Sequence, residues 1–306
     1  MTVCVATLCQ FGILGASDRM LTSGDVEFEP ETAKIYPLTS SIAAMVAGDS
    51  ALQSEIYLAL SKIIGGRVES DPNTWLLVKD IAYLYRDVRQ AIRRKRAEQA
   101  LLSPLGLDCD GFVSRQSAMA KDFVTRITEE IVNFSLPSTE TIIAGVDGDG
   151  SHIYTLINDD IRCDNSVGFS AIGSGYWHAN SQLMHARYNF VASLPDSLLL
   201  TYIAKRRAEI APGVGKGTDM FMVGPQLGSY TRINDVVLGQ LDRTYETILK
   251  KECRGLESGK KEIQKYVARL TEASAQAAAA KEQAAPSPPI QEQESPTTDG
   301  EKGASD

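Results

Sequence analysis

The first 48 residues contain four short runs of β-forming and apolar residues, separated by turn sequences such as Gln10-Phe11-Gly12. Residues of this kind at this density favour strands. The runs cover residues 2–8, 13–17, 34–38 and 42–47. Strands joined by short turns pair as a meander, with neighbours about 4.8 Å apart. We therefore expect the start of the first run, the end of the second and the start of the third to meet at one end of one sheet.

Residues of complementary chemistry stand at the ends of these runs. Thr2 precedes Asp18 by sixteen residues, and Asp18 precedes Lys34 by sixteen. A threonine hydroxyl is a weak nucleophile until a base takes its proton, and a free α-amine on the same residue is such a base. A nearby Lys34 ammonium would lower the pKa of that amine, and Asp18 would keep Lys34 charged. Gly48, where a strand gives way to a helix, would offer its N–H to a tetrahedral oxyanion.

The placement of these four residues resembles the β-type subunits of the proteasome, which are N-terminal-nucleophile (Ntn) hydrolases. The resemblance implies that Thr2, Asp18, Lys34 and Gly48 are the catalytic set. It implies that Thr2 becomes the first residue once Met1 is removed. The segment FSAIGSGYWHANSQL, residues 169–183, resembles the family's second glycine-serine turn, and this places a supporting Ser174 beside the nucleophile.

The same resemblance implies the substrate contacts. Thr22 and Gly24, within DRMLTSG at residues 18–24, match the segment that lines the substrate strand, and Met45 falls in the region that shapes the specificity pocket. Pro212 and Gly215 stand where the family carries an Asp and a Ser that support the nucleophile. The resemblance spans residues 2–64 and 140–232.

Helical periodicity and further strands come after the first 48 residues. Apolar spacing predicts helices near 51–64, 72–97, 116–134, 176–191 and 195–210. Strands are expected at 141–146, 152–158, 168–172 and 220–223, with Asp147-Gly148-Asp149-Gly150 as a hairpin turn. The second group of strands is expected to form another meander. The resemblance implies an α+β fold, a four-layer αββα sandwich with two antiparallel sheets between helix layers.

Three segments are expected along the chain. Residues 1–250 form the Ntn-hydrolase domain, with a helical insertion at about 98–134. Residues 251–272 form a helical extension. Residues 273–306 are rich in Ala, Pro, Ser, Glu and Gln and contain no aromatic residue, a composition typical of disordered tails.

Charge and cysteine content limit the classes of partner. A net charge of −8 argues against nucleic acid as the main partner, and no apolar run is long enough to span a membrane. The five cysteines show no paired spacing, which predicts reduced thiols in a cytoplasmic protein, with Cys4 and Cys9 in the core. The histidines, including His178 and His185 seven residues apart, form no metal-binding pattern, so no metal and no cofactor are expected.

The sequence thus predicts a threonine-type endopeptidase that hydrolyses peptide bonds through an acyl-enzyme on Thr2. Its partners would be peptides or unfolded proteins, inside a homo-oligomeric ring or spiral that shields the sites; an ATPase partner is not identified. Two alternatives stay open. One is a catalytically inactive structural ring subunit, and the other is an amidase or acylase of the Ntn class acting on small substrates.

Overall fold

The computed structural model describes residues 2–23, 26–29, 34–71 and 75–283. Contacts divide the chain into two compact units, Met1–Tyr245 and Glu246–Asp306, and each is described by itself. Within the described residues no helix is both long and apolar enough to cross a bilayer.

Two five-stranded antiparallel sheets form the centre of the first unit. One sheet has the order β10 (Phe169–Ile172), β1 (Cys4–Cys9), β2 (Gly12–Asp18), β11 (Thr218–Val223) and β12 (Thr231–Arg232). The other runs β5 (Ile35–Pro37), β6 (Ile42–Gly48), β7 (Thr139–Asp147), β8 (Gly150–Ile157) and β9 (Asp160–Cys163). A separate hairpin pairs β3 (Leu21–Ser23) with β4 (Val26–Phe28).

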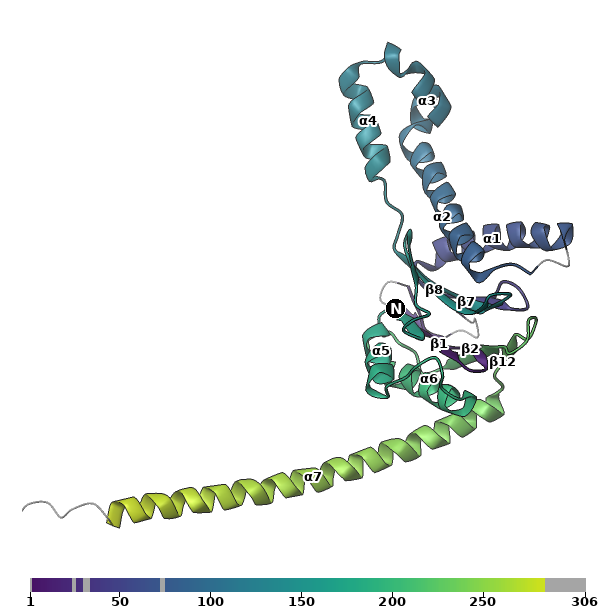
Figure 1. The fold of residues 1–306 in the computed structure, drawn as a ribbon. Helices are drawn as coiled ribbons and strands as arrows, with labels where there is room; N and C mark the ends of the chain where they lie inside the picture. The colour runs from purple at the N-terminus through teal and green to yellow at the C-terminus, as the bar shows by residue number, and fades with distance from the viewer. Residues whose placement is uncertain (1, 24–25, 30–33, 72–74, 284–306) are drawn as a thin grey trace, which may run out of the picture. The chain divides into compact units, whose positions relative to one another are not determined.

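The two sheets face each other, and helices cover both outer faces (Figure 1). Apolar side chains from both sheets, among them Ile13, Met45 and Phe221, form the core between them. The helices α1 (Ser50–Ser70) and α2 (Val78–Leu101) pack on the sheet that contains β6 and β7. The helices α5 (Tyr176–His185) and α6 (Leu194–Ala208) pack on the sheet that contains β1 and β10. The predicted arrangement of two antiparallel sheets between helix layers is therefore present.

The predicted order of strands within the sheets is wrong. β1 and β2 lie in one sheet while β5 and β6 lie in the other, so the first four runs are not one meander. Likewise β10 leaves the second group of strands and pairs with β1. Every residue of β1 and β2 is buried. Strands covered on both faces need partners on both edges as well, and pairing with β10 supplies the second edge of β1.

Several helix boundaries differ from those expected from apolar spacing. The Asp49 side chain accepts a hydrogen bond from Leu52 N at 2.7 Å, which caps α1. The expected helix start near residue 72 is wrong, because α2 begins at Val78; residues 72–74 lie outside the described part. The predicted helix 176–191 ends at His185, and Arg187 has a positive φ of 53° that a continuing helix does not allow.

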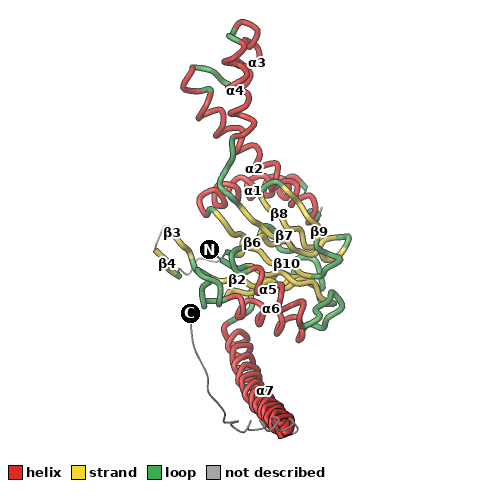
Figure 2. The backbone as a smooth tube through the Cα atoms, turned by 90° about the vertical axis from the view of Figure 1, so that its left-hand side faces the viewer, coloured by secondary structure: helices red, strands yellow, loops and turns green. Residues whose placement is uncertain are grey.

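The expected insertion is an arm built on the end of α2 (Figure 2). It contains a 3₁₀ turn, η1 (Ser103–Leu105), the helix α3 (Cys109–Arg115), a second turn, η2 (Gln116–Ala118), and the helix α4 (Lys121–Asn133). The single helix predicted for residues 116–134 is therefore divided. Leu102, Phe112 and Ile127 form a small apolar core within the arm.

The last helix, α7 (Asp235–Gln283), extends past the boundary expected at residue 272. Residues 273–283 are Ala, Ser, Gln, Lys and Glu, most of which are strong helix formers. Low apolar content therefore did not prevent local helix formation there. The rest of the predicted tail, residues 284–306, lies outside the described residues.

The packing between the sheets predicts a contrast between two isoleucines. Ile142, on β7, has no exposed surface and belongs to the core between the sheets, whereas Ile157, at the end of β8, is 39% exposed. Replacing a buried isoleucine with alanine costs about 2–5 kcal/mol. Ile142→Ala should lower the free energy of unfolding by that amount in urea titration, and Ile157→Ala by less than about 1 kcal/mol. Equal losses would contradict this assignment of the core.

Candidate active site

Strand pairing brings Asp18 and Ser174 to Thr2. Cys4 pairs with Ser17 of β2 and with Ile172 of β10. Because both partners run antiparallel to β1, residues just before Cys4 lie beside residues just after Ser17 and Ile172. The N–H of Asp18 donates to the carbonyl of Val3 at 3.1 Å and so continues the first pairing.

Lys34 comes from the facing sheet. It directly precedes β5, and its carbonyl accepts a hydrogen bond from Val46 N of β6 at 3.1 Å. Its side chain crosses to the other sheet, where Nζ lies 2.9 Å from Asp18 Oδ1. The expectation that these residues share one site is met. The route differs from the expected meander, because the site joins the ends of two sheets.

The Thr2 hydroxyl lies between the two charged groups. Thr2 Oγ1 donates to Asp18 Oδ1 and accepts from Lys34 Nζ. All three residues are nearly inaccessible, with exposed fractions of 4% for Thr2, 0% for Asp18 and 5% for Lys34. In a buried setting a charge interacts more strongly than in water. The hydroxyl therefore sits in a polarised environment that a surface threonine lacks.

Backbone groups orient the Asp18 carboxylate. Oδ1 accepts from Val3 N at 2.9 Å, and Oδ2 accepts from Met20 N at 3.0 Å and Gly215 N at 2.9 Å. Hydrogen bonds to an ionised carboxylate are among the stronger ones in proteins and offset the cost of burying the charge. Three main-chain N–H groups thus hold the carboxylate: one just before β1, one just after β2, and one in the distant turn that contains Gly215.

The main chain of Thr2 contacts the glycine-serine turn, residues 173–175. Thr2 N donates to Ser174 Oγ at 3.2 Å, and Gly175 N donates to the Thr2 carbonyl at 3.2 Å. Gly173 has a φ of +84°, and a side chain there would place Cβ 2.4 Å from the Thr2 carbonyl oxygen. Its N–H donates to Glu140 Oε2 of β7 at 2.7 Å. The predicted neighbour, Ser174, therefore lies against the predicted nucleophile, and a glycine permits the close approach.

Gly48 lies at the end of β6, just before the cap of α1. Its φ of +96°, together with the Ser138 carbonyl 2.4 Å from the position of an added Cβ, restricts the position to glycine. It is exposed, and Val46, two residues earlier, contacts the Lys34 backbone. The role of its N–H as an oxyanion donor stays a prediction.

The structure gives less support to the three residues predicted to contact the substrate. Thr22 lies in β3, which begins three residues after Asp18. Gly24 lies outside the described residues. Met45 has no exposed surface and packs in the core between the sheets. Its side chain does not reach a surface open to a substrate, so the structure gives no support to that predicted contact.

Two residues with a part in the site were not predicted. Gly215 was noted only as a departure from the family pattern, yet its N–H binds Asp18. Lys205 of α6 is completely buried and donates to the Gly215 carbonyl at 2.9 Å. A backbone donor has no sequence signature. For Lys205 the sequence offers only the apolar stretch Tyr202-Ile203-Ala204 that precedes it.

Cys4 is the other nucleophilic side chain close to the site. It is buried, and its Sγ donates to the Val46 carbonyl at 3.5 Å. Burial raises the pKa of the Cys4 thiol far above its usual range, and the neighbouring Lys34 charge only partly opposes this. Since the thiolate is the reactive form, Cys4 does not compete with Thr2 as a nucleophile.

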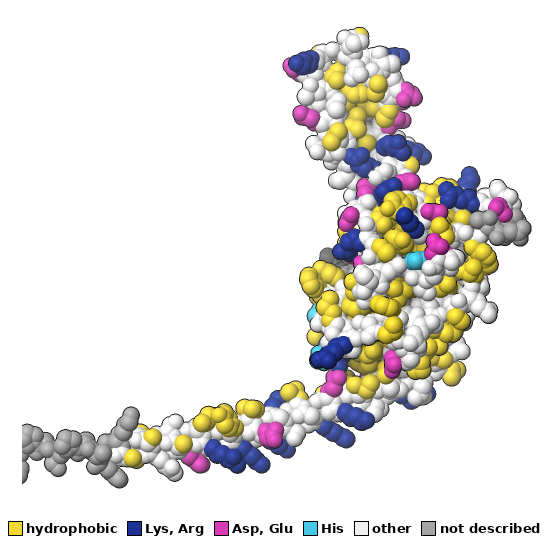
Figure 3. All heavy atoms as spheres, viewed as in Figure 1, with side chains coloured by type: hydrophobic (Ala, Val, Ile, Leu, Met, Phe, Trp, Pro, Cys, Tyr) yellow, Lys and Arg dark blue, Asp and Glu magenta, His cyan; other side chains and the backbone are white. Residues whose placement is uncertain are grey.

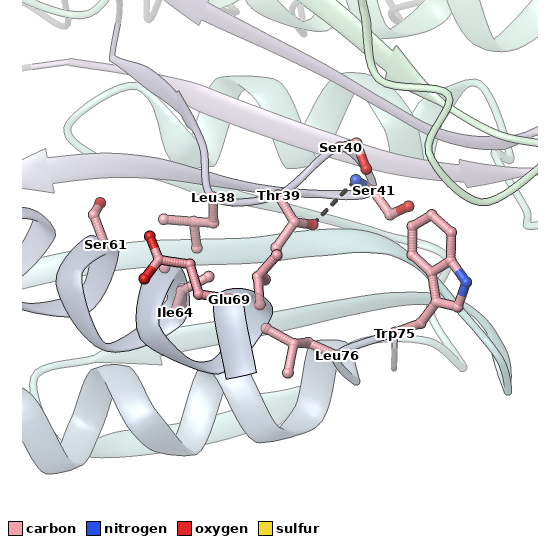
Figure 4. A pocket seen from close by; sticks show the side chains of 11 residues that line it. Leu38, Thr39, Ser40, Ser41, Ser61, Ile64, Glu69, Trp75 and Leu76 are labelled. Carbon is pink, nitrogen blue, oxygen red and sulfur yellow. Dashed lines mark hydrogen bonds between the residues drawn. The ribbon is translucent and has the colours of Figure 1, made fainter. Parts of the chain in front are cut away.

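No cluster of three or more metal-ligating side chains occurs within the part of the chain that the structure describes. A cavity of about 460 Å³ lies between α1 and the turn that joins β5 to β6 (Figure 4). Ser41 N donates to Thr39 Oγ1 at its rim, and Trp75 and Ile64 contribute apolar walls. No residue of the Thr2 site lines this cavity, so it has no part in the chemistry of Thr2.

Neither the known protein-family models nor the curated protein sequences compared with this chain match it. A function for the chain therefore has to be inferred from the geometry around Thr2.

The burial of the cysteines predicts a labelling pattern. Cys4 and Cys9 are buried and unpaired, whereas Cys109, Cys163 and Cys253 are exposed. Iodoacetamide at pH 8 should modify the three exposed thiols in the native protein and all five after unfolding, as measured by peptide mass spectrometry. Prompt modification of Cys4 in the native state would show that the raised pKa and burial assigned to it are wrong.

Proposed function

We propose that this chain is an N-terminal threonine peptidase of the Ntn-hydrolase class, built like a proteasome β-type subunit. One observation carries the proposal: the Thr2 hydroxyl contacts both members of a buried Lys34–Asp18 ion pair. The free thiols fit a reducing compartment, and we place the protein in the cytoplasm.

In the proposed reaction, hydrolysis of the bond between Met1 and Thr2 first converts the Thr2 nitrogen into an α-amine. Thr2 Oγ1 then attacks the carbonyl carbon of a peptide bond, and its proton passes to that amine. The ammonium of Lys34 stabilises the negative charge that develops on Thr2 Oγ1 as the proton leaves. Asp18 holds Lys34 in place, and Ser174 Oγ, 3.2 Å from the Thr2 nitrogen, orients the base.

The negative charge of the tetrahedral intermediate then falls on the former carbonyl oxygen, where the Gly48 N–H would donate. Collapse of the intermediate breaks the C–N bond, and the leaving amine takes the proton from the Thr2 ammonium. The acyl group stays on Oγ1 as an ester. A water molecule, deprotonated by the Thr2 amine, hydrolyses the ester and regenerates the site.

A peptide substrate is favoured by the chain that comes after Asp18. In the described residues β3 pairs only with β4, and it begins three residues after Asp18. An unpaired strand edge binds an extended peptide by adding it as a strand. A peptide bound there in an extended conformation would lie close to Thr2. A small amide would not need such a strand edge in order to bind.

A peptide epoxyketone tests the nucleophile and the amine together. Oγ1 adds to the ketone and the free α-amine opens the epoxide, with no leaving group. Intact mass should therefore rise by the full inhibitor mass, on a chain that has lost Met1. Thr2→Ala should stay unlabelled while its free energy of unfolding changes by about 1–2 kcal/mol or less, because the Lys34–Asp18 pair remains.

Thr271→Ala is the matched control, since Thr271 is an exposed threonine on α7. It should be labelled like the unmodified chain. A chain that keeps Met1 and resists labelling would favour the inactive structural subunit. Labelling combined with turnover of small amides but not of peptides would favour the amidase.

We further propose that the sites are enclosed in a homo-oligomer, ring or spiral. The arm has its own core, and Leu105, Val113 and Val132 are nevertheless 49–67% exposed on it; apolar side chains are visible over the arm in Figure 3. A contiguous exposed apolar patch is typical of a subunit contact, and we propose that the arm provides one. Such contacts would hold the helix layers of neighbouring copies together.

Light scattering at micromolar concentration should give several times the mass of one chain. Val113→Glu, which puts a charge on the arm surface, should lower that mass, whereas Val191→Glu, at another exposed valine (56%) outside the arm, should not. A monomer that still cleaves peptides would overturn the proposed enclosure.

A further inference from the structure

Lys205 of α6 is a completely buried cation, and two of its three side-chain hydrogen bonds reach a turn outside its own helix. Nζ donates to the carbonyls of Gly215 at 2.9 Å and Lys216 at 3.0 Å, and to Glu209 Oε1 at 2.7 Å. These three acceptors use the full donor capacity of an ammonium group. Burial lowers the pKa of Lys205, and the Glu209 carboxylate opposes that shift.

The turn that Lys205 holds is the turn that reaches Asp18. Gly215 accepts from Lys205 through its carbonyl and donates through its N–H to Asp18 Oδ2 at 2.9 Å. One residue thus connects the buried lysine to the carboxylate beside Thr2. The Lys205 ammonium and the Asp18 carboxylate are therefore connected through these two hydrogen bonds and the Gly215 backbone.

Met20 and Glu29 pack closely against the turn at Gly215. A Cβ on Gly215 would lie 2.8 Å from Met20 Cβ and 2.1 Å from Glu29 Oε1. Gly217 N also donates to Glu29 Oε1 at 3.3 Å. This close packing and the two hydrogen bonds from Lys205 restrict the turn that carries the Gly215 N–H.

Simple packing does not explain a lysine at this position. Burying an ammonium is costly, and an apolar side chain of the same length would fill the space at lower cost. Two of the three donors of Lys205 are directed at the main chain of the turn. The ammonium group therefore serves to hold that turn.

We infer that Lys205 is a positioning residue for the Thr2 site. It fixes residues 213–217 so that the Gly215 N–H orients Asp18, which in turn aligns Lys34 and the Thr2 hydroxyl. The effect on the turn is independent of any activity. The effect on reaction rate rests on the proposed function.

Hydrogen exchange tests the effect on the turn. Lys205→Met should raise the exchange rate of the Gly215 amide, followed in a peptide covering residues 211–219, by about tenfold or more, the change expected from losing one hydrogen bond. Lys216→Met is the matched control, because that side chain lies on the same turn and is exposed; its exchange should match the unmodified chain. Unchanged exchange in Lys205→Met would overturn the inference.

If Lys205→Met does not fold, Lys205→Met/Glu209→Gln replaces it. Removing both partners of a buried pair is far less destabilising than removing one. The same tenfold rise in exchange at Gly215 is expected in the double variant, and unchanged protection there would equally overturn the inference.

Inactivation by the peptide epoxyketone tests the effect on the site. In Lys205→Met the inactivation rate at saturating inhibitor should fall about tenfold or more, while the half-saturating concentration stays within about twofold. Lys205→Arg, which keeps a cation and N–H donors, should recover part of the rate. If the unmodified chain is not inactivated, the proposed function fails and the exchange experiment still decides the role of Lys205. If the unmodified chain is inactivated and Lys205→Met reacts equally fast, only the positioning role fails.

Discussion

The buried ion pair between Lys34 and Asp18 is the interaction on which the site depends. Lys34 enters from the sheet that contains β5 and Asp18 from the sheet that contains β2. The pair therefore connects the ends of the two sheets at the point where Thr2 lies. Removing one partner of such a pair leaves an uncompensated buried charge, which costs about 3–5 kcal/mol. The same contact thus links the two sheets and polarises the Thr2 hydroxyl.

Main-chain groups supply most of the support around this pair. The N–H groups of Val3, Met20 and Gly215 bind the Asp18 carboxylate, and the N–H of Gly175 binds the Thr2 carbonyl. Donors carried by strands and turns are fixed before any reaction begins, so they need no reorganisation as charge develops. The N–H of Gly215 reaches Asp18 from a turn that is distant in sequence. The inferred role of Lys205 follows from this, because a backbone donor is only as well placed as the turn that carries it.

The sequence was a good guide to the charged and hydroxyl groups of the site and a poor one to the rest. Thr2, Asp18 and Lys34 were expected together because of their side-chain chemistry and their positions at strand ends, and Ser174 was expected beside them because of the resemblance of its turn. Lys205 was missed because a lysine near a helix end ordinarily lies in solvent, and only packing of α6 against β1 and β2 buries it. Met45 was assigned to a pocket because an apolar residue in a strand has the same pattern whether it lines a pocket or fills a core.

The sequence by itself determined where the longer strands and most helices lie, where the arm is inserted, and that apolar faces exist for two sheets and their helices. These are local properties, set by residue type and spacing. Only the tertiary structure decided which strands share a sheet. β1 and β2 are apolar on both faces, and nothing in such a run specifies the partner on its second edge. The need to cover both faces and pair both edges brought β10 to β1 and moved β5 and β6 to the opposite sheet, and that choice placed Lys34 across from Asp18.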